Sequence, residues 1–365
     1  MKFTCIKENL ERAVAMAERF VGKSLNLPIL STILLESEDG WLTVSATNLE
    51  FAVKINVAGK GQRKGRAAVP AKTLSPLIQS IKDEKIDLEE KQGNIFIKSS
   101  TREIRINGMA ADDFPLIPKV KKTHSFEADG FGLAKGLEKV LPAVSSSDFK
   151  PELNGVYWKL SGTQLNLVAT DTFRLAEKTI TLGGKKEGGN FSFILPQRAS
   201  QEVARIFGEA EEVTVSYGEN QTVFETDEIK VVSRLVDGNF PEYGGIIPKN
   251  FDVTAFINRR ELLDAVRASS IFTSKLQDVS LKLAPKELQV SSANQEVGEY
   301  KTSLPVKATG EEVSLSFNYR YFLDGLNSLE EDEIFMGLNS EQKPSILKNK
   351  EDNSYVYVIM PIRVH

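Results

Sequence analysis

The sequence is poor in the residues that build most metal and catalytic centres. It has one cysteine, Cys5, and two histidines, His124 and His365, among 365 residues. A single cysteine cannot form an internal disulfide, which is typical of proteins kept in a reducing compartment. These three side chains also lack the spacing of zinc ligands. We therefore expect a cytoplasmic protein without a metal site or other cofactor.

Long apolar runs are absent as well. No stretch approaches the roughly 20 apolar residues of a membrane-spanning helix. The opening residues MKFTCIKENL contain no apolar signal region, so export is not expected. The formal net charge of −4 argues against a protein that is basic throughout, as a generic nucleic-acid binder would be. It leaves open how the charges are distributed.

Familiar catalytic motifs are missing too. There is no Gly-rich phosphate loop and no nucleophile elbow. The glycine pairs that flank Lys185 and Lys186 are typical of a hairpin tip. The acidic clusters 112–113 and 330–333 lack metal-ligand spacing and are typical of solvated turns. This pattern favours a binding or scaffolding role. An enzyme with an unrecognised carboxylate site, such as a hydrolase, remains an alternative.

What the chain does contain is one plan of elements that occurs three times, with a period of about 120 residues. Each copy has a strand, an amphipathic helix, several strands, a second helix and further strands. The six predicted helices span about 8–21, 71–81, 131–144, 196–207, 259–273 and 319–328. The first two copies end alike, on Phe114-Pro115 with Pro118-Lys119 and on Phe240-Pro241 with Pro248-Lys249.

A repeat of this length is a domain and not a solenoid unit. The basic segment 119–122 has no core residues and predicts a linker, with His124 beside it. We expect domains at 1–120, 124–248 and 249–365. Runs of strands broken by two helices favour an α+β class, with antiparallel sheets covered on one side by helices.

Basic residues recur on the predicted helices at spacings that place them on one stripe. These pairs are Arg12 with Arg19, Lys135 with Lys139, Arg198 with Arg205, and Arg260 with Arg267. Two interpretations stay open. The stripes could present a concave positive surface to phosphates. They could also be the ordinary exposed faces of amphipathic helices.

The stretch Val168–Ala176, VATDTFRLA, lies in the middle of the chain. It begins as a strand and breaks at Thr170-Asp171-Thr172, where small oxygen-bearing side chains can bond their own backbone and turn the chain. Arg174 follows directly. It could cover the core with its aliphatic stem, or it could belong to a site.

Several segments together resemble the bacterial β sliding clamps, the processivity subunits of the replicative DNA polymerase. The resemblance covers essentially the whole chain and is carried by LPILSTILLE (27–36), ATDTFRLA (169–176), DGNFPEYGGIIPK (237–249), FNYRYFLDGL (317–326) and VIMPIRV (358–364).

The resemblance implies a non-catalytic homodimer. Two chains would join head to tail into a ring of six domains, with helices lining a hole for duplex DNA and without base-specific contacts. The DNA-facing candidates are Lys23, Lys72, Lys150, Arg198, Arg205 and Lys275. The subunit contact would place Ile104 and Ile106 against Ile271 and Phe272, with Arg102 and Arg105 facing Glu296 and Glu299.

The resemblance also implies a pocket for short peptides of the DNA polymerase III catalytic subunit, the clamp loader and other partners. The matching positions are Leu153, Thr170, Thr172, Phe173, Arg174, Leu175, Pro241, Ile246, Val358, Met360, Pro361, Ile362 and Arg363. Thr172-Phe173 stands where the family usually has Gly-His, and the chain ends on Val364-His365, so its peptide preferences should be its own. A monomeric peptide-binding scaffold that does not encircle DNA is a second alternative, beside the enzyme.

Overall fold

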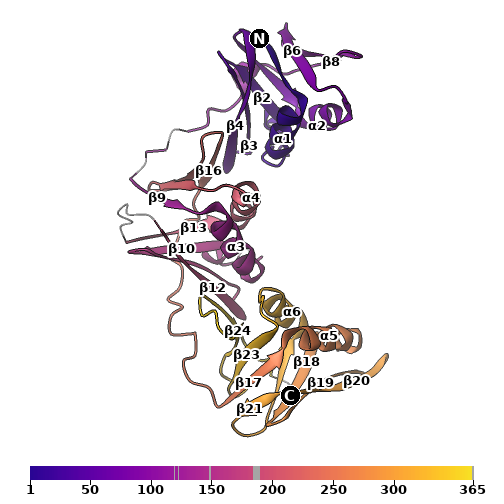
Figure 1. Ribbon diagram of the computed structural model, residues 1–365, viewed down its shortest axis with the longest axis vertical. Coiled ribbons are helices and arrows are strands. Elements are labelled where there is room, and N and C mark those ends of the chain that lie inside the picture. The colour runs from indigo at the N-terminus through magenta and orange to yellow at the C-terminus, as the bar shows by residue number, and fades with distance from the viewer. Residues whose placement is uncertain (119, 122, 148, 184–189, 364–365) are drawn as a thin grey trace. The chain divides into compact units, whose positions relative to one another are not determined.

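The computed structural model describes residues 1–118, 120–121, 123–147, 149–183 and 190–363 (Figure 1). The described chain divides into two compact units. The first holds residues 1–131 and 205–235, and the second holds 132–183, 190–204 and 236–363. The predicted hairpin tip around Lys185 and both ends of the predicted linker lie outside the described residues.

The predicted plan of strand, helix, strands, helix, strands is confirmed in all three copies. The first copy comprises β1 (Lys2–Ile6), α1 (Lys7–Glu18), β2 (Thr32–Ser37), β3 (Trp41–Thr47), β4 (Phe51–Arg63), β5 (Gly65–Pro70), α2 (Ala71–Ser80), β6 (Lys85–Lys91), β7 (Asn94–Lys98) and β8 (Glu103–Ile106). The second comprises β9 (His124–Ala128), α3 (Gly130–Val140), β10 (Gly155–Ser161), β11 (Gln164–Thr170), β12 (Arg174–Thr181), β13 (Phe191–Pro196), α4 (Gln197–Phe207), β14 (Val213–Tyr217), β15 (Gln221–Glu225) and β16 (Ile229–Arg234).

The third copy inserts one short strand, β21. It comprises β17 (Val253–Asn258), α5 (Arg259–Ser269), β18 (Asp278–Ala284), β19 (Glu287–Asn294), β20 (Gly298–Pro305), β21 (Lys307–Thr309), β22 (Val313–Asn318), α6 (Tyr319–Asn327), β23 (Glu333–Leu338), β24 (Ser345–Asn349) and β25 (Tyr355–Ile359). Short 3-10 turns lie at Pro28–Ser31, Ala111–Asp113, Leu141–Ala143, Pro151–Leu153 and Ser270–Phe272.

All six predicted helices are present, but three end at least three residues earlier than predicted. The helix expected to reach Val21 ends at Glu18. Those expected to reach Val144 and Thr273 pass into 3-10 turns, in the first case at Pro142, which lacks the N–H that an α-helical turn needs. His124 was expected at a linker but is the first residue of β9, where its ring stacks on Tyr217 of β14.

The strands pair antiparallel, as the α+β prediction requires. The sheet of the first unit runs β8-β7-β6-β1-β4-β16-β15-β14-β9, with β2, β3 and β5 attached beside it. In the second unit, one sheet runs β13-β10-β11-β12-β25-β24-β23-β17-β21 and another runs β20-β19-β18-β22. Two pairings, β4 with β16 and β12 with β25, therefore join neighbouring copies edge to edge.

Helices pack against these sheets in pairs. α1 contacts α2 and strands β1, β3 and β4, and α5 contacts α6, β19 and β20 (Figure 1). The apolar stripe predicted for α1 is buried at Leu10, Val14 and Ala17. Asn258, predicted to cap α5, accepts a hydrogen bond from the backbone N–H of Glu261 at 3.1 Å, which satisfies one unpaired donor of the first turn.

Candidate functional site

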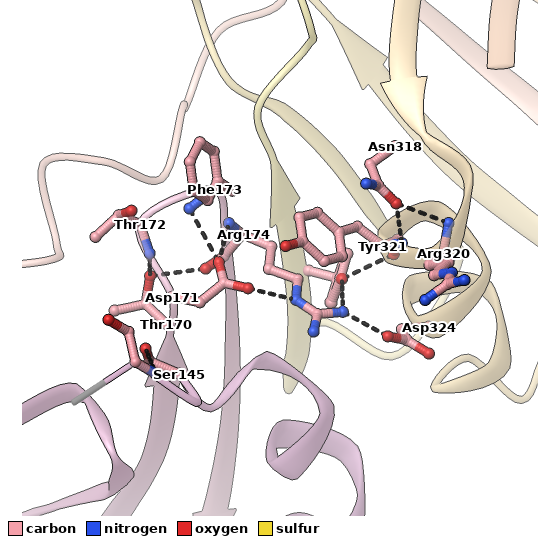
Figure 2. A network of polar contacts seen from close by, with 12 residues as sticks. Ser145, Thr170, Asp171, Thr172, Phe173, Arg174, Asn318, Arg320, Tyr321 and Asp324 are labelled. Atoms are coloured by element: carbon pink, nitrogen blue, oxygen red, sulfur yellow. Dashed lines mark hydrogen bonds and ion pairs between the residues drawn. The ribbon is translucent and has the colours of Figure 1, made fainter. Parts of the chain in front are cut away.

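The turn between β11 and β12 is held by its own side chains, as the sequence predicted (Figure 2). Thr170 Oγ1 donates to the carbonyl of Arg174 at 2.7 Å and accepts from the N–H of Thr172 at 3.2 Å. Asp171 Oδ1 accepts from the N–H groups of Phe173 at 2.9 Å and Arg174 at 3.0 Å. Thr172 has a φ of 78°, in the left-handed region that an L-residue adopts only at some cost.

Arg174 leaves this turn and is enclosed by charged and aromatic groups. Its Nε donates to Asp171 at 2.9 Å, and its Nη1 contacts the carboxylate of Asp324 on α6. Its guanidinium carbon lies 4.1 Å from the ring centre of Tyr321 (Figure 2). The Arg174 side chain is only 10% exposed. The sequence analysis did not foresee Tyr321 or Asp324 as partners, although both lie within the segment FNYRYFLDGL.

The surroundings keep Arg174 charged. Burial acts to lower the pKa of Arg174, but Tyr357 and the carboxylates of Asp324 and Asp171 together raise that pKa above its ordinary value. Burial also raises the pKa of Tyr357, whose hydroxyl donates to the carbonyl of Tyr321 at 2.8 Å. Because the contacts of Arg174 are internal, this cation serves to hold the β11–β12 turn on α6.

The helix α6 can reach the turn because it packs closely on β25. Asn318 accepts from the N–H groups of Arg320 and Tyr321 and so fixes the start of the helix. A Cβ at Gly325 would stand 2.6 Å from the ring of Tyr357. Only glycine therefore allows this approach without displacement of the tyrosine.

An apolar cluster lies beneath the same turn. Leu175 of β12 is paired with Val358 of β25 in the sheet. Both are buried with Val168, Tyr243 and Ile346. Tyr243 belongs to segment 236–250, which runs from the second copy to the third, so this segment is packed onto the β12–β25 junction.

The end of the described chain is held in place by two backbone hydrogen bonds. The N–H of Met360 donates to the carbonyl of Phe173 at 2.8 Å, and the N–H of Ile362 donates to that of Ser316 at 2.7 Å. Chain ends usually fray, and these two hydrogen bonds are the physical reason why this terminal segment is ordered.

The predicted pocket residues differ in burial and fall into three groups. Five are buried, and these are Leu153, Thr170, Leu175, Val358 and Pro361. Three are half-buried, namely Arg174, Met360 and Ile362. The exposed ones are Thr172, Phe173, Pro241, Ile246 and Arg363, with Phe173 59% and Ile246 43% exposed. Two large exposed apolar side chains near a buried apolar cluster are what a surface that binds an apolar ligand needs.

All six DNA-facing candidates have exposed side chains in the structure, and these are Lys23, Lys72, Lys150, Arg198, Arg205 and Lys275. One residue of the predicted basic stripes, Lys139, has a buried side chain. The Lys139 side chain is 9% exposed, lies 3.2 Å from the carboxylate of Glu330 and lies 5.6 Å from the ring centre of Tyr355. The predicted stripe of Lys135 with Lys139 is therefore wrong, because Lys139 is used inside the protein.

The residues expected at a subunit contact lie at sheet edges or beside them. β8, with Ile104 and Ile106, is the outermost strand of the first unit's sheet. Ile104 is half-buried and Ile106 is 6% exposed, so Ile106 already packs within its own copy. Ile271 is 68% exposed, and Phe272 stacks on Tyr300 of β20, itself an outermost strand.

Within the described ranges, no group of three or more His, Cys, Asp or Glu residues is arranged to hold a metal ion. None of the helices in the part of the chain that the structure describes is long and apolar enough to cross a membrane.

Three domain families match the chain in order. DNA polymerase III beta subunit, N-terminal domain, matches residues 1–118, the central domain matches 130–242 and the C-terminal domain matches 245–363. The three repeated α+β domains are thus clamp domains, and the class of protein is a DNA clamp, a non-catalytic processivity factor of DNA replication. The chain belongs to the DNA polymerase III beta subunits, the sliding clamps that tether a DNA polymerase to DNA.

Similar proteins cover this chain from end to end. The beta sliding clamp of Synechococcus elongatus is 27% identical over 373 residues, and that of Bacillus subtilis is 25% identical over 379 residues, each with 100% of both chains covered. The crystal structure of the DNA polymerase III beta subunit of Thermotoga maritima has a TM-score of 0.94 at 28% identity, with both chains fully covered. The Pseudomonas aeruginosa clamp, solved bound to griselimycin, has a TM-score of 0.95 at 25% identity and full coverage.

Proposed function

We propose that two copies of this chain join head to tail into a ring of six domains around duplex DNA. The observation that carries this proposal is the pairing of neighbouring copies within the chain. At both internal junctions, the third strand after the first helix of one copy pairs antiparallel with the last strand of the next copy: β4 with β16, and β12 with β25. β20 and β8 are the corresponding strands of the third and first copies, and both are outermost.

The internal junction also suggests a register for the subunit contact. β12 and β25 pair the first residue of one strand, Arg174, with the last residue of the other, Ile359. The β4–β16 junction instead pairs the first residue of β4, Phe51, with Ser233, the last residue but one of β16. The β12–β25 rule would place Gly298 of β20 opposite Ile106 of β8 in the other subunit, and we propose this register because of the charges that it pairs.

That register gives two cross-strand pairs of opposite charge, Glu299 with Arg105 and Lys301 with Glu103. Opposite charges that face each other across strands are favourable, each by about 0.2–1 kcal/mol. A shift by one residue would instead oppose Lys301 to Arg102. The exposed Ile271 would gain apolar cover in the same contact, alongside Ile104 and Phe272.

The proposed domains are 1–120, 124–248 and 249–365, close to the residues that the three domain families match. Inside the ring, we expect the six exposed cations of the candidate set to contact DNA phosphates. Phosphate contacts carry no sequence information, so the clamp can slide. We infer a cytoplasmic location from this role in replication.

We propose that the surface around Phe173, Ile246 and Met360 binds short peptides of the DNA polymerase III catalytic subunit, the clamp loader and other clamp-binding proteins. Its buried base and exposed apolar rim suit an apolar peptide, and the flexible Met360 can adapt to several of them. Arg174 would act through its internal contacts, which position Phe173 against the terminal segment. Arg363 is exposed and is the cation placed to meet a polar group of the ligand.

Light scattering across a dilution series from about ten micromolar tests the ring. A mass near twice the chain mass of 40.5 kDa is expected. A persistent monomer would overturn the ring and favour the monomeric scaffold.

In a second test, clamp loaded on closed circular DNA should be retained and should escape once the DNA is cut, because encirclement is a topological link. Equal loss from both forms of DNA would also overturn encirclement.

A further inference from the structure

The turn between β3 and β4 is a second copy of the turn between β11 and β12. Thr47 Oγ1 donates to the carbonyl of Phe51 at 3.1 Å and accepts from the N–H of Leu49 at 3.0 Å. Asn48 Oδ1 accepts from the N–H groups of Glu50 at 3.0 Å and Phe51 at 2.9 Å. The β11–β12 turn has the same four bonds at the same positions.

The backbone agrees as closely as the hydrogen bonds do. Leu49 has a φ of 77° and Thr172, at the equivalent position, has 78°. The next bond in the series is conserved as well. The N–H of Arg234 donates to the carbonyl of Glu50 at 2.8 Å, just as the N–H of Met360 donates to that of Phe173.

A groove lies at this second turn, in the first unit. It is bounded by the turn, by segment 115–118 and by β15 and β16. Most of its lining positions are equivalent to positions of the peptide site proposed above. In the turn and the strand after it, Thr47, Leu49, Glu50, Phe51 and Ala52 correspond in that order to Thr170, Thr172, Phe173, Arg174 and Leu175. Elsewhere, Pro115 corresponds to Pro241, Val232 to Val358 and Arg234 to Met360. The chain thus carries the framework of that site twice.

The side chains on this framework define a different ligand. At the position equivalent to Arg174, which contacts α6, the first copy has Phe51. Its ring packs on Phe20 with ring centres 4.8 Å apart. Where the peptide site has Met360, the groove has the exposed cation Arg234. Leu116, 93% exposed, also lines the groove.

The groove has room for one anchor. Its volume is about 110 Å³, smaller than the roughly 150 Å³ of a cavity that holds benzene. One aliphatic side chain of leucine size fits this space, whereas two would not. The apolar wall formed by Leu49, Leu116 and Val232 suits such a side chain. The rim carries both Glu50 and Arg234, and the guanidinium of Arg234 suits a single carboxylate that faces it.

We propose that this groove is a second peptide-binding site, which takes a short segment with one aliphatic side chain next to an aspartate or glutamate. The proposal rests on the proposed function, because it extends the peptide site to an equivalent position. Charge complementarity with Arg234 selects the acidic neighbour. A clamp would then have a weaker contact on the same chain, and two linked contacts of one partner would add avidity.

The probe is the tetrapeptide acetyl-Gly-Asp-Leu-Gly-amide. Its binding is measured by NMR of the methyl groups of the full-length protein. Saturable shifts are expected at the methyl groups of Leu49, Leu116 and Val232, with a Kd of about 1 mM, typical of a contact with one anchor. Arg234→Glu should weaken binding at least about tenfold. The matched peptide with Lys in place of Asp should bind Arg234→Glu better than the original protein.

The NMR shifts distinguish the two sites. The methyl groups of Val358 and Met360 report on the peptide site at the β11–β12 turn, and those of Leu49 and Val232 report on the groove. Shifts at Leu49 and Val232 that Arg234→Glu removes support the second site, whatever the first site does. Shifts at Met360 alone, or at neither site, overturn the second site. The ring is tested separately by the dilution series, so its failure is distinguishable from failure of the groove.

Discussion

The guanidinium of Arg174 lies over the ring of Tyr321, 4.1 Å from its centre, and reaches Asp324 one helical turn further on. Arg174 is the first residue of β12 in the second copy, and the other two residues belong to α6 of the third copy. This contact fixes the β11–β12 turn, which carries Phe173 of the proposed peptide site, on α6.

Replacement of Arg174 by alanine should lower the free energy of unfolding by about 2 kcal/mol, since hydrogen bonds to charged groups contribute roughly 1.5–3 kcal/mol. Urea unfolding measures the change. Arg12→Ala is the matched control, because its ion pair with Glu228 is 3.7 Å long and its side chain is 65% exposed. An exposed pair should contribute under about 1 kcal/mol. Equal losses in both variants would contradict the role assigned to Arg174.

Charge reversal at the proposed subunit contact should be mutually compensating. Arg105→Glu alone should shift the dimer toward monomer, because it would face Glu299 across the strands. Glu299→Arg alone should do the same. The double variant, Arg105→Glu with Glu299→Arg, should dimerise with a Kd roughly tenfold lower than either single variant, a difference of about 1.4 kcal/mol. Sedimentation of all three reports the result. A double variant no better than the single ones would mean that the register is wrong.

Removal of the terminal side chains should weaken peptide binding and spare the ring. Met360→Ala with Arg363→Ala is expected to raise the Kd for a peptide of the polymerase catalytic subunit at least about tenfold, since anchor residues typically contribute 1–2 kcal/mol or more. Fluorescence anisotropy of the labelled peptide measures the affinity. Unchanged affinity at unchanged dimer mass would remove Met360 and Arg363 from the site.

Loss of cations from α4 should change the salt dependence of DNA binding and not its sequence dependence. Each phosphate contact removed lowers the slope of log K against log salt by about 0.9 for duplex DNA. Because the proposed ring has two subunits, Arg198→Ala with Arg205→Ala would remove four cations and should reduce the slope by up to about 3.6. Lys343→Ala is a control, since its exposed cation is outside the candidate set. An unaltered slope in the double variant would show that these residues do not touch phosphate.

Stability should fall in alkaline solution partly because of Cys5. Burial, with a smaller contribution from Asp87, raises the pKa of the Cys5 thiol from 9.0 to about 12. The folded state thus holds the proton more tightly than the unfolded state. The stability from this difference is complete below pH 9 and is lost as pH rises from 9 toward 12. Urea midpoints of the original protein should fall more steeply over this window than those of Cys5→Ala. Parallel pH profiles would contradict the burial effect.

The amino-acid pattern by itself predicted the order of elements, because each element carries its own period. Leu10, Val14 and Ala17 define the buried stripe of α1 without reference to the rest of the chain. The turn at Thr170-Asp171-Thr172 was also predictable, since its hydrogen bonds join residues at most four apart. The family resemblance supplied the candidate sites, which local pattern could not.

Only the tertiary structure decided how the basic residues are used. Lys139 and Arg198 are both basic residues of a predicted helix stripe. Lys139 is nevertheless buried against Glu330 and Tyr355, while Arg198 is exposed. Arg174 and Asp324 are 150 residues apart, so no local period connects them. Such pairings depend on where β12 meets β25 and where α6 crosses them. The physical reason is that sequence fixes the periodicity of each segment, whereas burial and ion pairing depend on which distant segments pack together.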